Sequence, residues 1–125
     1  MRKYRIVAVD DSTIVLKMVE RVLSDKYEVY PFTDGMKALI FMENKAKKPD
    51  LIILDIEMPG VDGYMVLDLI RMAEHLKDVP VIFLTSNKDK EDVIKAFSNG
   101  AKDYIVKPVS EKTLLDKIQS LLKRR

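Results

Sequence analysis

Three short runs of almost purely apolar residues constrain the fold of this 125-residue chain more than any other feature. They occupy residues 6–9, 51–54 and 81–84. Apolar runs of this length, bounded by turn or charged residues, are typical of strands that are covered on both faces. Such strands occur in parallel sheets whose two faces carry helices, so the runs predict an α/β fold.

Longer segments with helical spacing of apolar residues alternate with the short runs. We predict strands at about 4–9, 28–30, 51–54, 81–84 and 104–106. Helices are predicted at about 12–24, at 34–45 with Asp34 as N-cap, from the loop at 58–63 to about 75, at 88–98, and from about 110 onward. Five strand–helix units predict a doubly wound, flavodoxin-like (βα)5 fold, with a five-stranded parallel sheet and helices on both faces.

The composition predicts one soluble domain that covers residues 1–125. The 22 basic and 20 acidic residues are interspersed, which does not indicate direct nucleic-acid binding. No apolar stretch approaches the length of a membrane span, and the chain has no cysteine, so we expect a cytoplasmic protein without membrane contact. The basic end at 123–125 is interpreted as a solvated helix end, with a linker as the alternative.

Polar residues follow four of the predicted strands directly. Asp10 and Asp11 follow the first, Asp55 the third, Thr85 the fourth and Lys107 the fifth. In a parallel sheet these strand ends meet at one edge, which is where doubly wound folds bind ligands. Each residue alone has an ordinary explanation, as a turn residue, an N-cap or a surface lysine. Their coincidence at corresponding strand ends indicates a functional site.

Clustered carboxylates repel one another, and such a cluster favours a bound cation. Mg²⁺ fits because it prefers oxygen ligands. A carboxylate beside a cation, a hydroxyl and an ammonium suits phosphoryl transfer through an aspartyl-phosphate, since the ammonium and the hydroxyl can hold the phosphoryl oxygens.

Four motifs surround these residues: Val9-Asp10-Asp11-Ser12, Leu54-Asp55-Ile56-Glu57-Met58-Pro59-Gly60-Val61-Asp62-Gly63, Leu84-Thr85-Ser86 and Gly100-Ala101-Lys102-Asp103-Tyr104-Ile105-Val106-Lys107-Pro108. Together these motifs resemble the receiver domain of two-component response regulators. The resemblance covers almost the whole chain and implies strand order 2-1-3-4-5.

The resemblance implies that Asp55 accepts a phosphoryl group from a phosphohistidine on a sensor histidine kinase or a phosphotransfer protein. It implies that Asp11 and Asp55 bind Mg²⁺ directly. Asp10 would act largely through water, and the backbone carbonyl of Glu57 would complete the protein ligands.

The same resemblance gives roles to residues on the last two strands. Thr85 would hydrogen-bond the phosphoryl group, Lys107 would pair with it, and the Lys107–Pro108 bond would be cis. Tyr104 would act with Thr85 as a switch, turning inward on phosphorylation. This would change partner binding through the fourth helix, fifth strand and last helix. The alternative for Tyr104 is an aromatic side chain that simply packs near the last helix.

Glu57, Ser86 and Asn87 match positions that tune the phosphoryl lifetime in this family. The carboxylate of Glu57 could reach the metal or position a water, or it could be a solvated loop charge.

We expect a switchable binding module and no conventional turnover enzyme. The first alternative is a phosphatase or phosphotransferase that forms an aspartyl-phosphate, like the haloacid-dehalogenase type, which has a second aspartate where this chain has Glu57. The second is the amino-terminal receiver of a longer regulator with a DNA-binding or enzymatic output domain. The downstream partner is unknown, and the sequence allows a monomer or a phosphorylation-dependent dimer.

Overall fold

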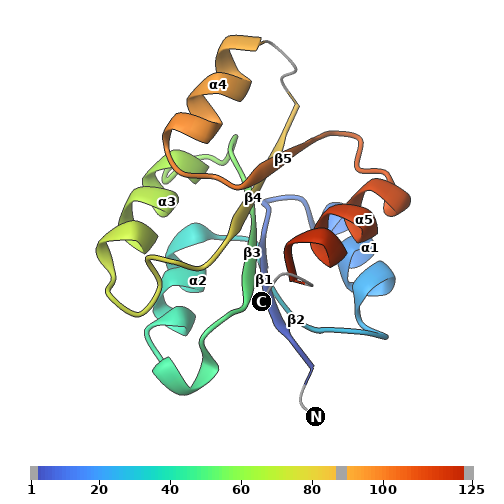
Figure 1. Cartoon of the computed structure of the whole chain (residues 1–125), viewed down its shortest axis with the longest axis horizontal. Coiled ribbons are helices and arrows are strands. Elements are labelled where there is room, and N and C mark those ends of the chain that lie inside the picture. Colours follow the sequence, from blue (N-terminus) through green and yellow to red (C-terminus); the bar gives the residue numbers. More distant parts are fainter. Residues whose placement is uncertain (1–2, 87–89, 123–125) are drawn as a thin grey trace.

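The chain forms one five-stranded sheet in which all strand pairs are parallel and the order is β2-β1-β3-β4-β5 (Figure 1). A computed structural model describes residues 3–86 and 90–122. The strands are β1 (Arg5–Val9), β2 (Glu28–Phe32), β3 (Leu51–Asp55), β4 (Val81–Thr85) and β5 (Asp103–Val106). The predicted fold class and strand order are confirmed.

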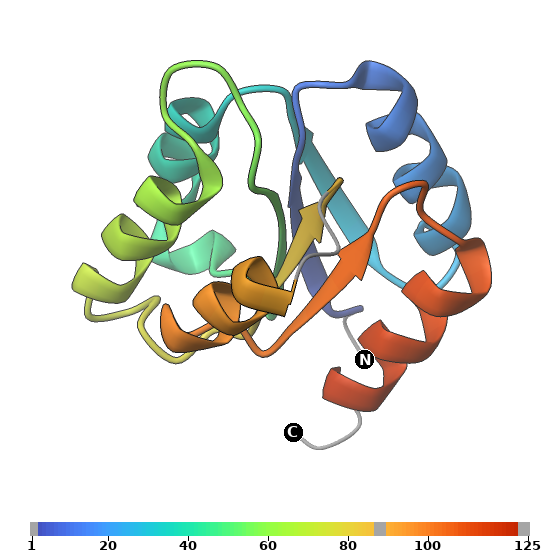
Figure 2. The same cartoon turned by 90° about the horizontal axis from the view of Figure 1, so that it is seen from above.

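Helices cover both faces of the sheet (Figure 2). They are α1 (Thr13–Leu23), α2 (Gly35–Met42), α3 (Gly63–Met72), α4 (Lys90–Ser98) and α5 (Glu111–Leu122), with a short 3-10 turn, η1 (Lys45–Lys47), after α2. One face packs against α1 and α5, and the other against α2, α3 and α4. The helices thereby divide the apolar core into two layers.

The central strands explain the continuous apolar runs of the sequence. Every residue of β3 and of β4 is buried. Alternate residues of each strand enter opposite layers, so Ile52 packs with α3 while Ile53 packs with α1 and α5. A strand with a helix layer on each side has no polar face, and its first polar residue marks the edge of the sheet.

Three helices begin at polar caps in the loops that follow β1, β2 and β3. Ser12 accepts a hydrogen bond from the Val15 amide, and Asp62 accepts one from Met65. Asp34 accepts two, which confirms its predicted role as N-cap. These side chains satisfy amides that the first helical turn leaves without partners.

The predicted end of the second strand is wrong. Pro31 does not end β2, which continues to Phe32. β2 is an edge strand, and its one neighbour in the sheet is β1. A proline is tolerated in an edge strand because no second strand needs its missing N–H, so Pro31 stays in register opposite Ala8.

Two helices are shorter than predicted. The second ends at Met42, three residues early, and gives way to η1; the third ends at Met72, because Ala73 is already extended. In α2 the buried face is formed by Gly35, Ala38 and Met42, and the apolar side chains of Met36 and Ile40 are exposed.

Some predictions concern residues outside 3–86 and 90–122: the start of the fourth helix at 88, the role of Asn87 and the basic end at 123–125. Within the described ranges, no helix has the length and apolar character needed to cross a membrane.

Gly63 fixes α3 against the end of β3. Its amide donates to the carbonyl of Ile56, at 3.0 Å. A Cβ added at Gly63 would come closer to the Asp55 carbonyl oxygen and the Ile56 Cα than real Cβ atoms do. Only glycine lets the helix begin this close to the strand that carries Asp55.

We expect Gly63→Ala to lower the free energy of unfolding by about 3 kcal/mol, because its methyl group meets backbone that cannot rotate away. Gly60→Ala is the matched control: Gly60 has a φ of +80° and open space around its Cα. It should lose about 1 kcal/mol from backbone strain alone. Urea unfolding of both variants tests this, and equal losses would contradict the contact.

Candidate functional site

The carboxyl ends of four strands bring the predicted site residues together. Asp10 and Asp11 follow β1, Asp55 ends β3, Thr85 ends β4 and Lys107 follows β5. The register places Asp55 beside Leu84, and Thr85 beside Val106. Neighbouring strands thus end level with one another, and their polar residues share one edge of the sheet.

Three carboxylates form the centre of this site. Asp10, Asp11 and Asp55 each offer one oxygen, and these oxygens lie within 4.8 Å of one another. The residues Asp10 and Asp55 are 0 % exposed, whereas Asp11 is open to solvent. Burial prevents water from screening the repulsion between the two inner carboxylates.

The protein satisfies only part of the hydrogen-bonding capacity of these carboxylates. Asp10 Oδ1 accepts from the amide of Ser12 at 2.9 Å, and Asp55 Oδ1 accepts from the amide of Glu57 at 3.2 Å. The Oδ2 atom of Asp55 is buried and receives no hydrogen bond from the described residues, and the buried Oδ2 atom of Asp10 contacts only the ammonium of Lys107 among them. Buried oxygens left in this way are unusual and fit a site that receives a further positive or hydrogen-bonding group.

Lys107 supplies a positive charge to the cluster. Its Nζ lies 2.9 Å from Asp10 Oδ2 and 3.4 Å from Asp55 Oδ1. Burial opposes the charged ammonium, but contact with Asp10 and Asp55 outweighs burial, so the pKa of Lys107 is raised. One ammonium among three carboxylates leaves the ionised site negative.

Asp55 carries the cost of this imbalance. Burial, followed by the charge of Asp10, raises the pKa of Asp55 from 3.8 to about 7, although Lys107 and the Glu57 amide act in the opposite direction. Near neutral pH the metal-free site therefore holds both the protonated and the ionised form of this carboxyl.

The residues present fit a hard metal cation. The three carboxylates provide oxygen donors only, the donor type that Mg²⁺ and Ca²⁺ prefer. Asp55 has a buried oxygen that lacks a hydrogen-bond donor among the described residues, and Asp11 lies open to solvent. The acidic pocket can therefore hold a metal.

Glu57 contacts the end of the neighbouring strand, a contact that was not predicted. Its Oε1 accepts from the Thr85 hydroxyl at 3.1 Å, and its Oε2 accepts from the Ser86 amide at 3.2 Å. Glu57 is exposed, yet these contacts distinguish it from a free loop charge. The predicted strand order could have indicated this contact. Glu57 lies two residues after the end of β3, Thr85 ends β4, and these two strands are neighbours.

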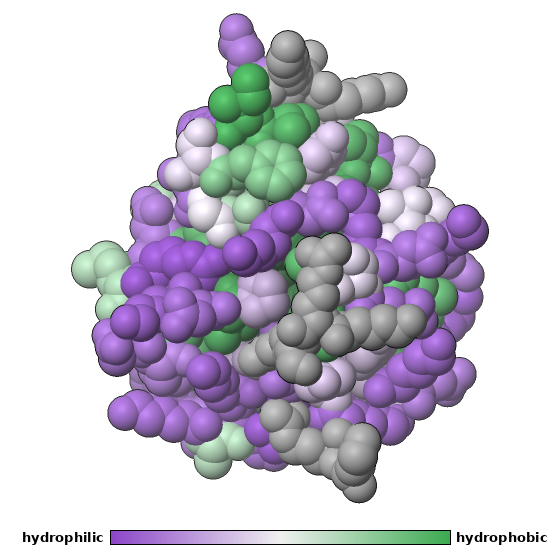
Figure 3. Space-filling view, viewed as in Figure 1, coloured by the Kyte–Doolittle hydropathy of each residue, from purple (hydrophilic) through white to green (hydrophobic). Residues whose placement is uncertain are grey.

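Tyr104 lies between the last two helices. Its ring packs edge-on against Phe97 of α4, with centroids 5.9 Å apart, and Lys117 of α5 places its Nζ 5.4 Å from the ring. These are the packing contacts of the alternative interpretation, and the switch role of Tyr104 stays a prediction. The Lys107–Pro108 bond is cis as expected. Figure 3 shows an apolar patch over α4, the helix on which Ile94 and Phe97 have exposed side chains.

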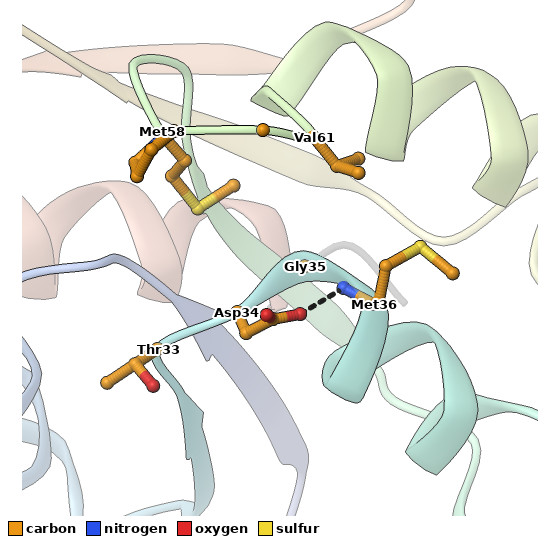
Figure 4. Close-up of a pocket in the computed structure, with 8 residues that line it drawn as sticks. Thr33, Asp34, Gly35, Met36, Met58 and Val61 are labelled. Carbon is orange, nitrogen blue, oxygen red and sulfur yellow. Dashed lines mark hydrogen bonds between the residues drawn. The ribbon is translucent and has the colours of Figure 1, made fainter.

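A cavity of about 260 Å³ lies between the loops after β2 and β3 (Figure 4). It is lined by residues such as Thr33, Met58 and Val61. The Asp34 carboxylate at its edge caps α2 and hydrogen-bonds the Met36 amide at 2.7 Å. None of the predicted site residues that the structure describes lines this cavity, so its lining differs from that of the acidic pocket.

The motifs, the sheet order and the acidic pocket agree with a comparison to known families. A family model for the response regulator receiver domain matches residues 6–119. The chain belongs to this family. It is a receiver domain of two-component signal transduction, as the motifs predicted.

Individual relatives support the same assignment. A probable transcriptional regulator ycf27 from Porphyridium aerugineum is 40% identical over 125 residues, which are 99% of this chain and 50% of that protein. The structure of the Vibrio cholerae chemotaxis protein CheY4 superposes with a TM-score of 0.88 at 32% identity and covers 95% of this chain and 98% of that chain. Response regulator Rcp1, solved in a Mn(2+)-bound form, matches with a TM-score of 0.76 at 30% identity over 94% of this chain and 91% of its own. The chain spans about half the length of the ycf27 relatives it matches.

The raised pKa of Asp55 predicts how stability depends on pH without metal. Between 3.8 and about 7 the folded protein binds this proton more tightly than the unfolded chain, so Asp55 reduces stability increasingly as pH rises through that window. We expect Asp55→Asn to raise the free energy of unfolding by about 1–3 kcal/mol at pH 8, and by much less at pH 4.5.

Urea unfolding in a chelator at both pH values measures this difference. Asp68→Asn is the control, because Asp68 is an exposed carboxylate on α3. An Asp55→Asn protein that is no more stable than the original chain at pH 8 would contradict the electrostatic cost.

Proposed function

We propose that Asp55 is the phosphoacceptor of this receiver domain. The observation that carries the proposal is its buried carboxylate, whose Oδ2 receives no hydrogen bond from the described residues and which lies beside Asp10 and 3.4 Å from the Lys107 ammonium. An Asp55 oxygen would form a bond to phosphorus while the phosphorus–nitrogen bond of a phosphohistidine breaks. The histidine nitrogen leaves with the electron pair, and the ionised carboxylate has no proton to lose.

We further propose that the metal of the acidic pocket is Mg²⁺. Asp11 and Asp55 would hold it, Asp10 would act largely through water, and the Glu57 carbonyl would complete the protein ligands. The ion supplies charge neutralisation for the phosphoryl oxygens when bound. Both the all-oxygen donor set and the Mn(2+)-bound form of Rcp1 support this proposal.

Lys107 and Thr85 would stabilise the transferred group. The Lys107 ammonium is already within 3.4 Å of Asp55 Oδ1, and it would pair with a phosphoryl oxygen that carries developing charge. Thr85 ends the neighbouring strand β4, and its hydroxyl would donate a hydrogen bond to a second phosphoryl oxygen. These residues position and neutralise, which is most of what phosphoryl transfer requires.

Phosphorylation would be read through α4, β5 and α5. Tyr104 connects this surface to the site, because it lies on β5 three residues before Lys107 and contacts both helices. The donor would be a sensor histidine kinase or phosphotransfer protein in the cytoplasm. The reader would be a downstream protein or an output domain, as the greater length of the ycf27 transcriptional regulators suggests. The domain would work as a switch and not as a turnover enzyme.

Incubation with acetyl phosphate and Mg²⁺ should add one phosphoryl group, measured as intact mass. The addition should require Mg²⁺ and be absent in Asp55→Asn, whereas Asp68→Asn should be modified like the original chain. No addition with acetyl phosphate or with a phosphorylated histidine donor would contradict the proposal. Repeated turnover of a small phosphate ester that depends on Asp55 would favour the phosphatase alternative.

Mg²⁺ should also stabilise the folded protein, because the unfolded chain lacks the pocket. At a Mg²⁺ concentration one hundred times its Kd, the gain should be about 2.7 kcal/mol. Thermal unfolding with and without Mg²⁺ measures this gain, and Asp11→Ala should remove most of it. An unchanged response in Asp11→Ala would mean that Asp11 is no ligand.

A further inference from the structure

The Glu57 carboxylate binds two residues at the end of β4, and the proposed phosphoryl transfer gives this side chain no role. The two carboxylate oxygens accept from two successive residues, the Thr85 hydroxyl at 3.1 Å and the Ser86 amide at 3.2 Å. The contact joins the loop after β3 to Thr85 and Ser86 at the end of β4, the strand that lies beside β3 in the sheet (Figure 1).

The position of this bridge matters because the sheet ends there. The Thr85 carbonyl accepts from the Lys107 amide at 2.8 Å, and Thr85 is the last residue of β4 in register with β5. Up to Thr85 the backbone is fixed by its neighbours. Ser86 lies beyond the last register pair of β4 and β5. Glu57 therefore binds the amide of the first residue after the paired part of β4.

The hydroxyl of Thr85 can serve one strong acceptor at a time. A threonine hydroxyl has a single proton to donate, and here that proton points to Glu57. A phosphoryl oxygen on Asp55 would need the same proton. The phosphoryl group and the Glu57 carboxylate are also both anionic, so they repel each other across a short distance.

We propose that Glu57 is a positioning residue that restrains Thr85 and Ser86 in the unphosphorylated arrangement, and that the phosphoryl group must displace it. The restraint belongs to the unphosphorylated protein. The competition rests on the proposed function, because it requires phosphorylation of Asp55. Glu57 thus acts against activation through its side chain, a role separate from that of its backbone carbonyl at the metal.

The first test uses the metal-free, unphosphorylated protein. Amide hydrogen exchange at Ser86, followed by NMR, should accelerate about fivefold or more in Glu57→Ala, because the amide loses its acceptor. Glu74→Ala is the matched control, because this substitution removes the same charge. Glu74 is exposed and lies beyond the end of α3. Unchanged exchange at Ser86 in Glu57→Ala would overturn the restraint.

The second test separates the restraint from simple charge repulsion. Phosphorylation by acetyl phosphate and Mg²⁺, timed by intact mass, should be about fivefold faster in Glu57→Ala, the effect expected for one partly exposed hydrogen bond. In a Thr85→Val background, where no hydroxyl is left to release, the same substitution should accelerate the reaction clearly less. Equal acceleration in both backgrounds would overturn the competition for the hydroxyl.

A further variant keeps the test decisive if Thr85→Val does not fold. Glu57→Gln removes the charge but retains an acceptor oxygen, so it should preserve part of the Ser86 protection and accelerate phosphorylation less than Glu57→Ala. If Glu57→Gln and Glu57→Ala behave identically in both measurements, Glu57 acts only through its charge, and the inference is overturned. If the original chain takes up no phosphoryl group, the proposed function fails, and exchange at Ser86 alone decides on the restraint.

Discussion

The repulsion between Asp10 and Asp55, buried together at one edge of the sheet, is the constraint on which the site depends. Both residues are 0 % exposed, and a protein keeps two such carboxylates close together only at a cost. Lys107 offsets part of that cost, and it contacts both carboxylates. The site is therefore close to electrostatic balance only when a further positive group or a proton is added.

The fold supplies the rigidity that this arrangement needs. The strands that carry Asp10, Asp55 and Thr85 are central in the sheet and lie between two apolar layers, so their ends have little freedom to separate and relieve the repulsion. Gly63 adds to this by letting α3 start directly against the carbonyl of Asp55. Packing far from the pocket thus keeps the charges together.

The sequence predicted much of this because the signals are local. The buried runs of β3 and β4 and the polar residue at each end depend only on short stretches of chain, and together they define the sheet edge and its residues. Helix ends were harder. The break at Ala73 and the extension of β2 through Pro31 follow from tertiary neighbours, which a single sequence does not display. The bridge from Glu57 to Thr85 also depends on loop conformation, and residue types alone left the role of this carboxylate open.

Lys107 and Tyr104 show how a change of charge at Asp55 can reach a surface. The ammonium is shared between Asp10 and Asp55, so a proton on Asp55, or the proposed phosphoryl group, would alter the forces on Lys107 directly. Lys107 follows β5, its amide is bonded to the Thr85 carbonyl, and Tyr104 lies earlier on the same strand between Phe97 and Lys117. Because Asp103 also pairs with Lys117 at 2.7 Å, the β5–α5 contact is itself partly electrostatic. A local rearrangement at Lys107 and Thr85 therefore acts on an edge strand whose contacts at Asp103 and Tyr104 are only half-buried, and such contacts can exchange at lower cost than those of the packed core.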